Sequence, residues 1–114
     1  MRDAILQASF FLQEHPEKFR FANGISPRSR GDMDGCALGW IGYFAGMRGR
    51  GVNEVAEKLL GISDDWFYVR MDLLTKTPLL STWSWGGRAC ARALRKYADK
   101  YFPDAGGMKE YMYV

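Results

Sequence analysis

The fold of this chain is decided by the stretch Asp34-Gly35-Cys36-Ala37-Leu38-Gly39-Trp40-Ile41-Gly42-Tyr43-Phe44-Ala45-Gly46. Its glycines recur at helical spacing, so one face of the predicted helix carries Gly35, Gly39, Gly42 and Gly46. A glycine inside a helix costs about 1 kcal/mol relative to alanine, and another element lying close against the bare backbone would offset that cost. The stretch therefore predicts a central, buried helix that serves packing rather than chemistry.

Length and composition are those of an ordinary globular protein. The chain has 114 residues, 47% of them hydrophobic and 25% charged, and we expect a single domain over residues 1–114. The net charge of +3 excludes an acidic mimic of nucleic acid and does not demand a nucleic-acid partner. The apolar run 36–47 is shorter than the roughly 20 residues of a membrane span, and the first residues lack a signal-peptide pattern. We therefore expect a cytoplasmic protein without membrane contact.

Four further helices are expected around the glycine-faced one. Their predicted limits are an Asp3 cap to about Glu14, an Asn53 cap to a left-handed stop at Gly61, a helix capped by Ser63, and a last helix from about Arg88 to Tyr101. The fold class is thus mainly α, a compact bundle of about five helices around the glycine-faced central helix. One small two-stranded β element is an option, in which the end of the chain, 108–114, pairs with 19–21.

The segment 23–35 precedes the glycine-faced helix and is rich in turn residues. It predicts one long exposed loop. Because loops of about a dozen residues in compact domains are often functional, this loop is a candidate binding surface.

Cys36 is the one candidate nucleophile, because it follows Asp34-Gly35 at the start of a predicted helix, where the helix dipole lowers a thiol pKa. The local sequence has a faint likeness to the Asp-Cys-Ser opening of papain-like cell-wall amidases. Those enzymes place their histidine base downstream, whereas His15, the only histidine here, lies upstream. A buried structural thiol is the alternative, and it is the one we favour.

Other catalytic and cofactor signatures are missing from the sequence. Asp32-Met33-Asp34-Gly35 matches part of a calcium loop but lacks the downstream glutamate, so we interpret Asp34 as a helix cap. One histidine and two distant cysteines do not make a zinc site, and the glycines do not form a phosphate-binding loop. We expect no metal, no cofactor and no enzymatic activity.

Arginines and tryptophans are the residues that point to a binding function. Arg88, Arg92, Arg95 and Lys96 form a basic stripe on the last helix. Further candidate nucleic-acid contacts are Arg28, Arg30, Arg48 and Arg50. A solvated helix face carries similar charges, so the stripe has an ordinary explanation as well.

Protein docking uses an overlapping set of residues. Tyr, Trp and Arg dominate interface hot spots, and the seventeen aromatic residues, Trp66 among them, exceed what a small core obviously needs. The predicted partner-binding residues are Trp83, Trp85, Arg88, Arg92 and Arg95. The alternative is that these rings only cover a self-contained core.

The chain resembles a group of small bacterial and phage proteins that open a helix with Cys-Ala-Leu-Gly. The matching pieces are 4–12, Cys36-Ala37-Leu38-Gly39, 55–61 and 90–97, and the chain departs from the pattern at Trp40 and at Trp83-Ser84-Trp85. The resemblance implies a helical fold and a bacterial or phage setting, and it brings no catalytic residues.

The leading hypothesis is a non-enzymatic accessory protein of phage or mobile-element type that binds another protein, for instance to inhibit a host defence protein. The alternatives are a DNA- or RNA-binding protein that uses the last helix, and a hydrolase that uses Cys36. The glycine-faced helix packs within the chain or across a dimer, so the oligomeric state stays open.

Overall fold

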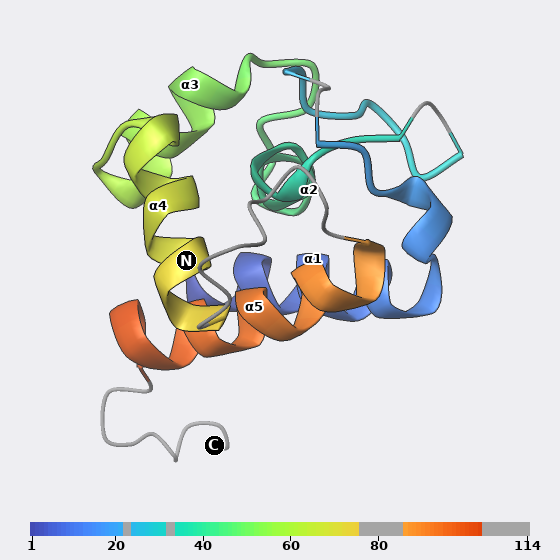
Figure 1. Ribbon diagram of the computed structural model, residues 1–114. Helices are drawn as coiled ribbons and strands as arrows, with labels where there is room; N and C mark the ends of the chain where they lie inside the picture. Colours follow the sequence, from blue (N-terminus) through green and yellow to red (C-terminus); the bar gives the residue numbers. More distant parts are fainter. Residues whose placement is uncertain (22–23, 32–33, 76–85, 104–114) are drawn as a thin grey trace, which may run out of the picture.

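The computed structural model describes residues 1–21, 24–31, 34–75 and 86–103 (Figure 1). This part of the chain is compact and mainly helical, which confirms the predicted class. Its α-helices are α1 (Arg2–Glu14), α2 (Ala37–Phe44), α3 (Val52–Val55), α4 (Asp64–Thr75) and α5 (Gly87–Tyr101). A 3₁₀ turn, η1 (Pro16–Lys18), follows α1, and a π-helical turn, η2 (Ala56–Leu60), continues α3.

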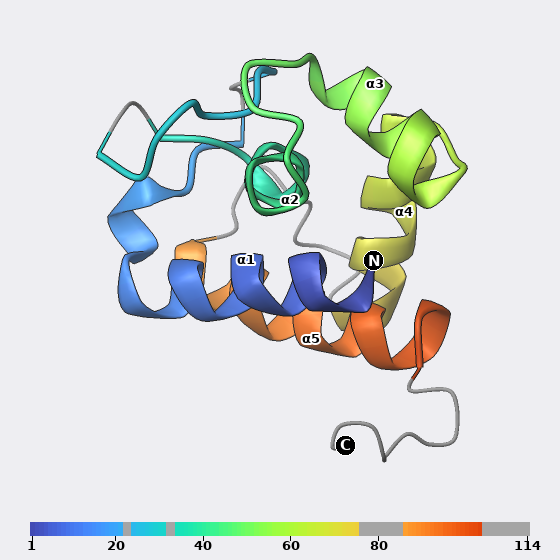
Figure 2. The same cartoon turned by 180° about the vertical axis from the view of Figure 1, so that it is seen from behind.

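Helices α1 and α5 lie antiparallel in one layer, and α2 packs against α1 (Figures 1 and 2). At one end of the pair, the Arg2 guanidinium donates hydrogen bonds to the carbonyl oxygens of Ala98 and Phe102. Near its middle, the buried Ser9 hydroxyl donates to the Ala91 carbonyl oxygen at 2.8 Å. These bonds give polar groups inside the helix pair their partners, which burial requires.

The core is formed by the apolar stripes that the sequence predicts. Ile5, Ala8 and Leu12 of α1 are fully buried, as are Leu94 and Tyr97 of α5. The predicted Asp3 cap is wrong, because α1 begins at Arg2 with Met1 as its N-cap and Asp3 lies in the first turn. There its carboxylate still meets the positive end of the helix dipole.

The glycine face of α2 is covered closely at Gly39 and Gly42, by the segment just before it in the chain and by Val55 of α3. Gly46, which was predicted to share this face, lies beyond the end of α2, and no described atom is within 4 Å of a Cβ placed there. A Cβ at Gly39 would lie 3.3 Å from the carbonyl oxygen of Ile25, and one at Gly42 would lie 3.0 Å from Ser26 Oγ. Ser26 and Pro27 are buried, and Ser26 Oγ donates to the Gly39 carbonyl oxygen at 2.7 Å. The prediction of one long exposed loop is therefore wrong at Ser26 and Pro27, because the bare helix face lets the backbone there lie close, whereas residues 28–31 are exposed as predicted.

The start of α2 also differs from the prediction. Cys36 is its N-cap, and the Cys36 thiol sulfur accepts from the Gly39 N–H at 3.4 Å. Asp34 instead pairs with Arg20, 2.6 Å from its Nε, so Asp34 is not the helix cap. An ion pair with a neighbouring segment has replaced the local capping bond.

The caps of the second half of the chain follow the sequence more closely. The backbone N–H of Trp66 donates to Ser63 Oγ at 3.2 Å, and Gly61 ends η2 in the left-handed conformation at φ +73°, both as predicted. The Asn53 cap is wrong, because the N-cap of α3 is Gly51, two residues earlier, and α3 begins at Val52. The Val52 N–H donates there to the Gly24 carbonyl oxygen, so a loop supplies the partner that a side-chain cap would have given.

Strand pairing among the described residues is limited to two isolated bridges. Phe19 pairs with Gly35 in parallel and Ile25 with Gly51 antiparallel. The predicted partner strand, 108–114, lies outside the described residues.

Candidate interaction surface

The face of α1 that points away from the core is the centre of the candidate surface. Gln7, Phe10 and Glu14 repeat at spacings of three and four residues, opposite the buried stripe, and all three are exposed. Phe10 is 56% exposed, although phenylalanine is among the residue types most often buried. We therefore take this exposed aromatic ring as the centre of the candidate surface.

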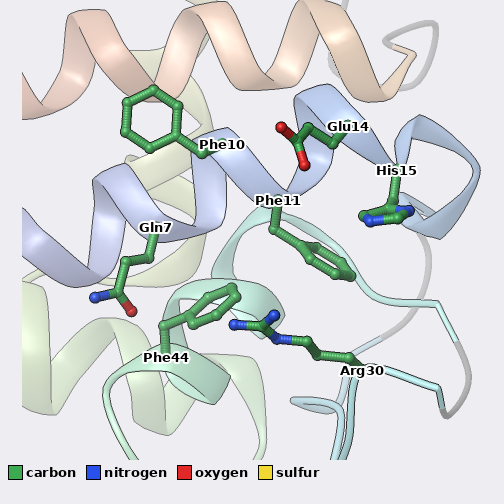
Figure 3. A pocket seen from close by; sticks show the side chains of 7 residues that line it. All are labelled: Gln7, Phe10, Phe11, Glu14, His15, Arg30 and Phe44. Carbon is green, nitrogen blue, oxygen red and sulfur yellow. The ribbon is translucent and has the colours of Figure 1, made fainter.

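On the side of α1 that faces α2 lies a pocket of about 260 Å³, here called the aromatic pocket (Figure 3). Its lining residues are Gln7, Phe10, Phe11, Glu14, His15, Arg30 and Phe44. The rings of Phe11 and Phe44 meet edge to face, with centroids 5.9 Å apart. The Arg30 guanidinium lies 5.3 Å from the Phe44 centroid and 5.9 Å from that of Phe11, within the range of a cation–π contact.

On the side of α1 that faces α5 lies a second pocket of about 190 Å³, here called the arginine pocket. It is lined by Gln13 of α1 and by Arg88, Arg92 and Arg95 of α5. The Arg95 guanidinium is held in place by hydrogen bonds to Ser9 Oγ at 2.9 Å and to Gln13 Oε1 at 2.6 Å. Both acceptors are neutral, so the full positive charge of Arg95 remains at the pocket.

The structure thus brings together three of the five residues predicted to bind a partner. Arg88 and Arg92 are exposed, and Arg95 is half-buried beside them. Lys96 is exposed on the same helix and does not line the pocket. Trp83 and Trp85 lie outside the described residues.

The four arginines predicted as further nucleic-acid contacts do not join this cluster. Arg30 lines the aromatic pocket, and the Arg48 guanidinium lies 4.3 Å from the Tyr43 ring centroid. Arg50 forms an ion pair with Glu54. Arg28 is exposed, and its guanidinium would meet a Cβ placed at Gly49. None of the four lines the arginine pocket as described.

Cys36 lies in a buried cluster with Cys90 and Tyr68. Both cysteines are free thiols with exposures of 2% and 0%, and burial raises the pKa of each thiol. The pKa of Tyr68 is raised well above its usual range, first by burial and then by the neighbouring Cys36. Catalysis by cysteine needs an accessible thiolate, and both burial and the raised pKa oppose its formation.

His15 is the one candidate base in the chain. It follows the last residue of α1, its side chain is 52% exposed, and its Nδ1 lies 3.7 Å from a Glu17 carboxylate oxygen. Its ring packs on Phe11 with centroids 5.0 Å apart, which makes it a wall of the aromatic pocket. Among the described residues, no three His, Cys, Asp or Glu side chains gather as metal ligands would.

Helix α4 carries another exposed apolar strip. Trp66 is 62% exposed and Leu73 is 71% exposed, with Val69 between them on the same face. The exposure of Trp66 confirms that not all aromatic residues are used in the core. The residues that follow α4 in the sequence, 76–85, lie outside the described part of the chain.

The aromatic half of the surface, namely Phe10, Phe11 and Phe44, was not predicted from the sequence. For Phe10 a signal exists, because it lies off the Ile5–Ala8–Leu12 stripe. For the other two none exists, because their proximity to Arg30 depends on how three segments pack.

Comparisons of the chain with protein-family models, with curated proteins and with solved structures found no match. Within the described ranges, every helix is too short or too polar to cross a bilayer.

Proposed function

We propose that this chain is a non-enzymatic binding protein that docks on the acidic surface of another protein. The contact surface is the outward face of α1 with the aromatic pocket on one side and the arginine pocket on the other. The observation that carries the proposal is the exposed Phe10 ring between these two pockets. An aromatic anchor flanked by arginines is the composition of interface hot spots.

The energy available from Phe10 is large enough to matter. A phenylalanine exposes roughly 200 Å² when free, so its exposed 56% corresponds to about 110 Å² of mostly apolar surface. At about 25 cal/mol per Å², burying this area in an interface would contribute about 2–3 kcal/mol. A loss of that size on truncation would make Phe10 a hot spot.

Charge decides in favour of a protein partner over nucleic acid. The Glu14 carboxylate lines the aromatic pocket, so the cluster of three arginines is confined to the α5 side of α1 and does not continue as a basic path across the helix. Arg48 lies over the Tyr43 ring and Arg50 pairs with Glu54, and neither lines the arginine pocket. A compact patch of acidic side chains fits three clustered arginines better than a long polyanion does.

The biological setting in this proposal rests on the Cys-Ala-Leu-Gly resemblance alone. For a phage or mobile-element protein, the docked partner would be a host protein, such as one of its defence proteins.

A pull-down with matched variants tests the proposed surface. The tagged chain captures proteins from nuclease-treated bacterial lysate, and one stoichiometric protein should be lost with Phe10→Ser and with Arg92→Glu. The controls are Leu73→Ser, an exposed apolar residue on α4, and Lys58→Glu, which makes the same charge change on η2. Both controls should retain the protein.

Two results would refute the proposal. Equal retention by all four variants would place the interface elsewhere. If proteins are captured from untreated lysate in a strongly salt-dependent way and are lost after nuclease treatment, the nucleic-acid alternative is favoured instead.

A further inference from the structure

The arginine pocket concentrates positive charge without compensation. Among residues 1–21, 24–31, 34–75 and 86–103, no carboxylate forms an ion pair with Arg88, Arg92 or Arg95. Elsewhere in these ranges, Arg2, Arg20 and Arg50 each form an ion pair with a carboxylate. Arg95 is instead fixed by uncharged oxygens, which orient its guanidinium while leaving its charge in place.

The position of Arg88 adds to this potential. It lies in the first turn of α5, whose N-cap, Gly86, has no side chain and whose first turn contains no acidic residue. The positive end of the helix dipole and the Arg88 guanidinium therefore reinforce each other. An anion bound in the pocket would be attracted both by the helix dipole and by the Arg88 guanidinium.

The number and shape of the donors select the anion. A guanidinium presents a rigid fork of N–H donors that matches two oxygens of one anion, and three such forks line a pocket of about 190 Å³. A carboxylate offers two oxygens and one negative charge. A phosphate monoester offers three oxygens and nearly two negative charges at neutral pH, and it satisfies more of the donors present.

We propose that the arginine pocket binds a phosphate monoester carried by a phosphorylated side chain of the partner. This inference rests on the proposed function, since it names the group that the partner places between α1 and α5. Arg95 orients the group from the helix interface, while Arg88 and Arg92 close over it from the exposed side of α5.

Isothermal titration calorimetry with small ligands tests the pocket itself. The probes are inorganic phosphate and the blocked tripeptide acetyl-Gly-phosphoserine-Gly-amide, at pH 7.5 and constant ionic strength, with the unphosphorylated tripeptide and chloride as references. We expect saturable binding of both phosphate compounds, competition between them, and at least tenfold weaker binding in Arg92→Gln. Lys96→Gln removes one charge from the same helix outside the pocket and should bind as the wild type does.

Three results would overturn this inference. Phosphate that binds no better than chloride would exclude a phosphate site. Equal weakening of phosphate binding in Arg92→Gln and Lys96→Gln would mean that binding depends only on the net positive charge of α5. Binding of a 5′-phosphorylated single-stranded oligonucleotide more than tenfold tighter than the phosphopeptide would exclude a protein as the source of the group.

A phosphatase experiment separates this inference from the proposed function. Treating the lysate with phosphatase before the pull-down should reduce the captured partner at least tenfold. Capture that survives phosphatase and is still lost with Phe10→Ser would overturn the phosphate site while leaving the docking surface standing.

Discussion

Gly87, the first residue of α5, packs against the backbone of η1, and this contact makes a sharp prediction. A Cβ at Gly87 would lie 2.5 Å from the Cα of Pro16 and 2.6 Å from its carbonyl oxygen. Non-bonded carbon atoms prefer about 3.5–4.0 Å. Because the obstacle is backbone rather than the end of a flexible side chain, Gly87→Ala must push α5 away from η1.

The expected cost follows from two opposing terms. Overpacking of this kind costs about 1–3 kcal/mol, and a backbone obstacle places Gly87→Ala at the upper end. Replacing a helical glycine by alanine returns up to about 1 kcal/mol. The free energy of unfolding should therefore fall by about 2 kcal/mol, which lowers the Tm of a domain of this size by about 8 °C.

The neighbouring residue provides the control. A Cβ at Gly86 would have no heavy atom within 4 Å among the described contacts, so Gly86→Ala should cost less than about 1 kcal/mol, the scale of a weakened N-cap. Urea unfolding followed by far-UV circular dichroism measures both variants. A Gly87→Ala protein as stable as Gly86→Ala would refute the packing of α5 on η1, and with it the geometry of the arginine pocket.

Three further predictions concern the buried parts of the chain. Gly42→Ala places a methyl group 2.7 Å from Val55 Cγ2 and should lower the free energy of unfolding by about 1–2 kcal/mol. The loss is smaller than for Gly87→Ala because the Val55 side chain can shift. An unchanged midpoint in urea unfolding would contradict the close cover of α2. Cys36 and Cys90 should react with iodoacetamide at pH 7.5 only as fast as the protein opens, and labelling at the rate of a free thiol would contradict their burial. Burial raises the pKa of both thiols, so the folded state holds their protons more tightly than the unfolded state does. The stability that this contributes is fully present below the unfolded thiol pKa of about 8.5. It is lost as pH rises through the raised pKa of the folded state. Unfolding midpoints measured from pH 7 to 10 should therefore stay level and then fall, and the fall should be smaller in the Cys36→Ala, Cys90→Ala double variant; an equal fall in both proteins would mean that the thiols do not contribute.

The fold was largely predictable because its helices carry their own patterns. The stripe Ile5–Ala8–Leu12 fixed the inner face of α1, and the glycine spacing showed that something lies close to α2. What lies there was not predictable, because the covering segment around Ser26 has turn residues and no periodicity.

Local capping rules succeeded where nothing competed with them, at Ser63 and Gly61. They failed at Asp34 and Asn53, where tertiary contacts supplied other partners.

The candidate surface was predictable by half. The arginines at spacings of four and three residues on one helix were visible in the sequence, and the structure places them in one pocket. The aromatic pocket was not visible, because Phe11, Phe44 and Arg30 come from three segments whose proximity is set by the packing of α1 on α2.

Hydroxyl-radical footprinting of the chain with its captured partner tests the docking surface most directly, because Phe10 and Trp66 are both oxidisable and comparably exposed, at 56% and 62%. The partner should protect Phe10 at least fivefold, while Trp66 on α4 should keep its free rate of oxidation. Protection of Trp66 with Phe10 still oxidised at the free rate would rule out docking on α1 and move the interface to α4.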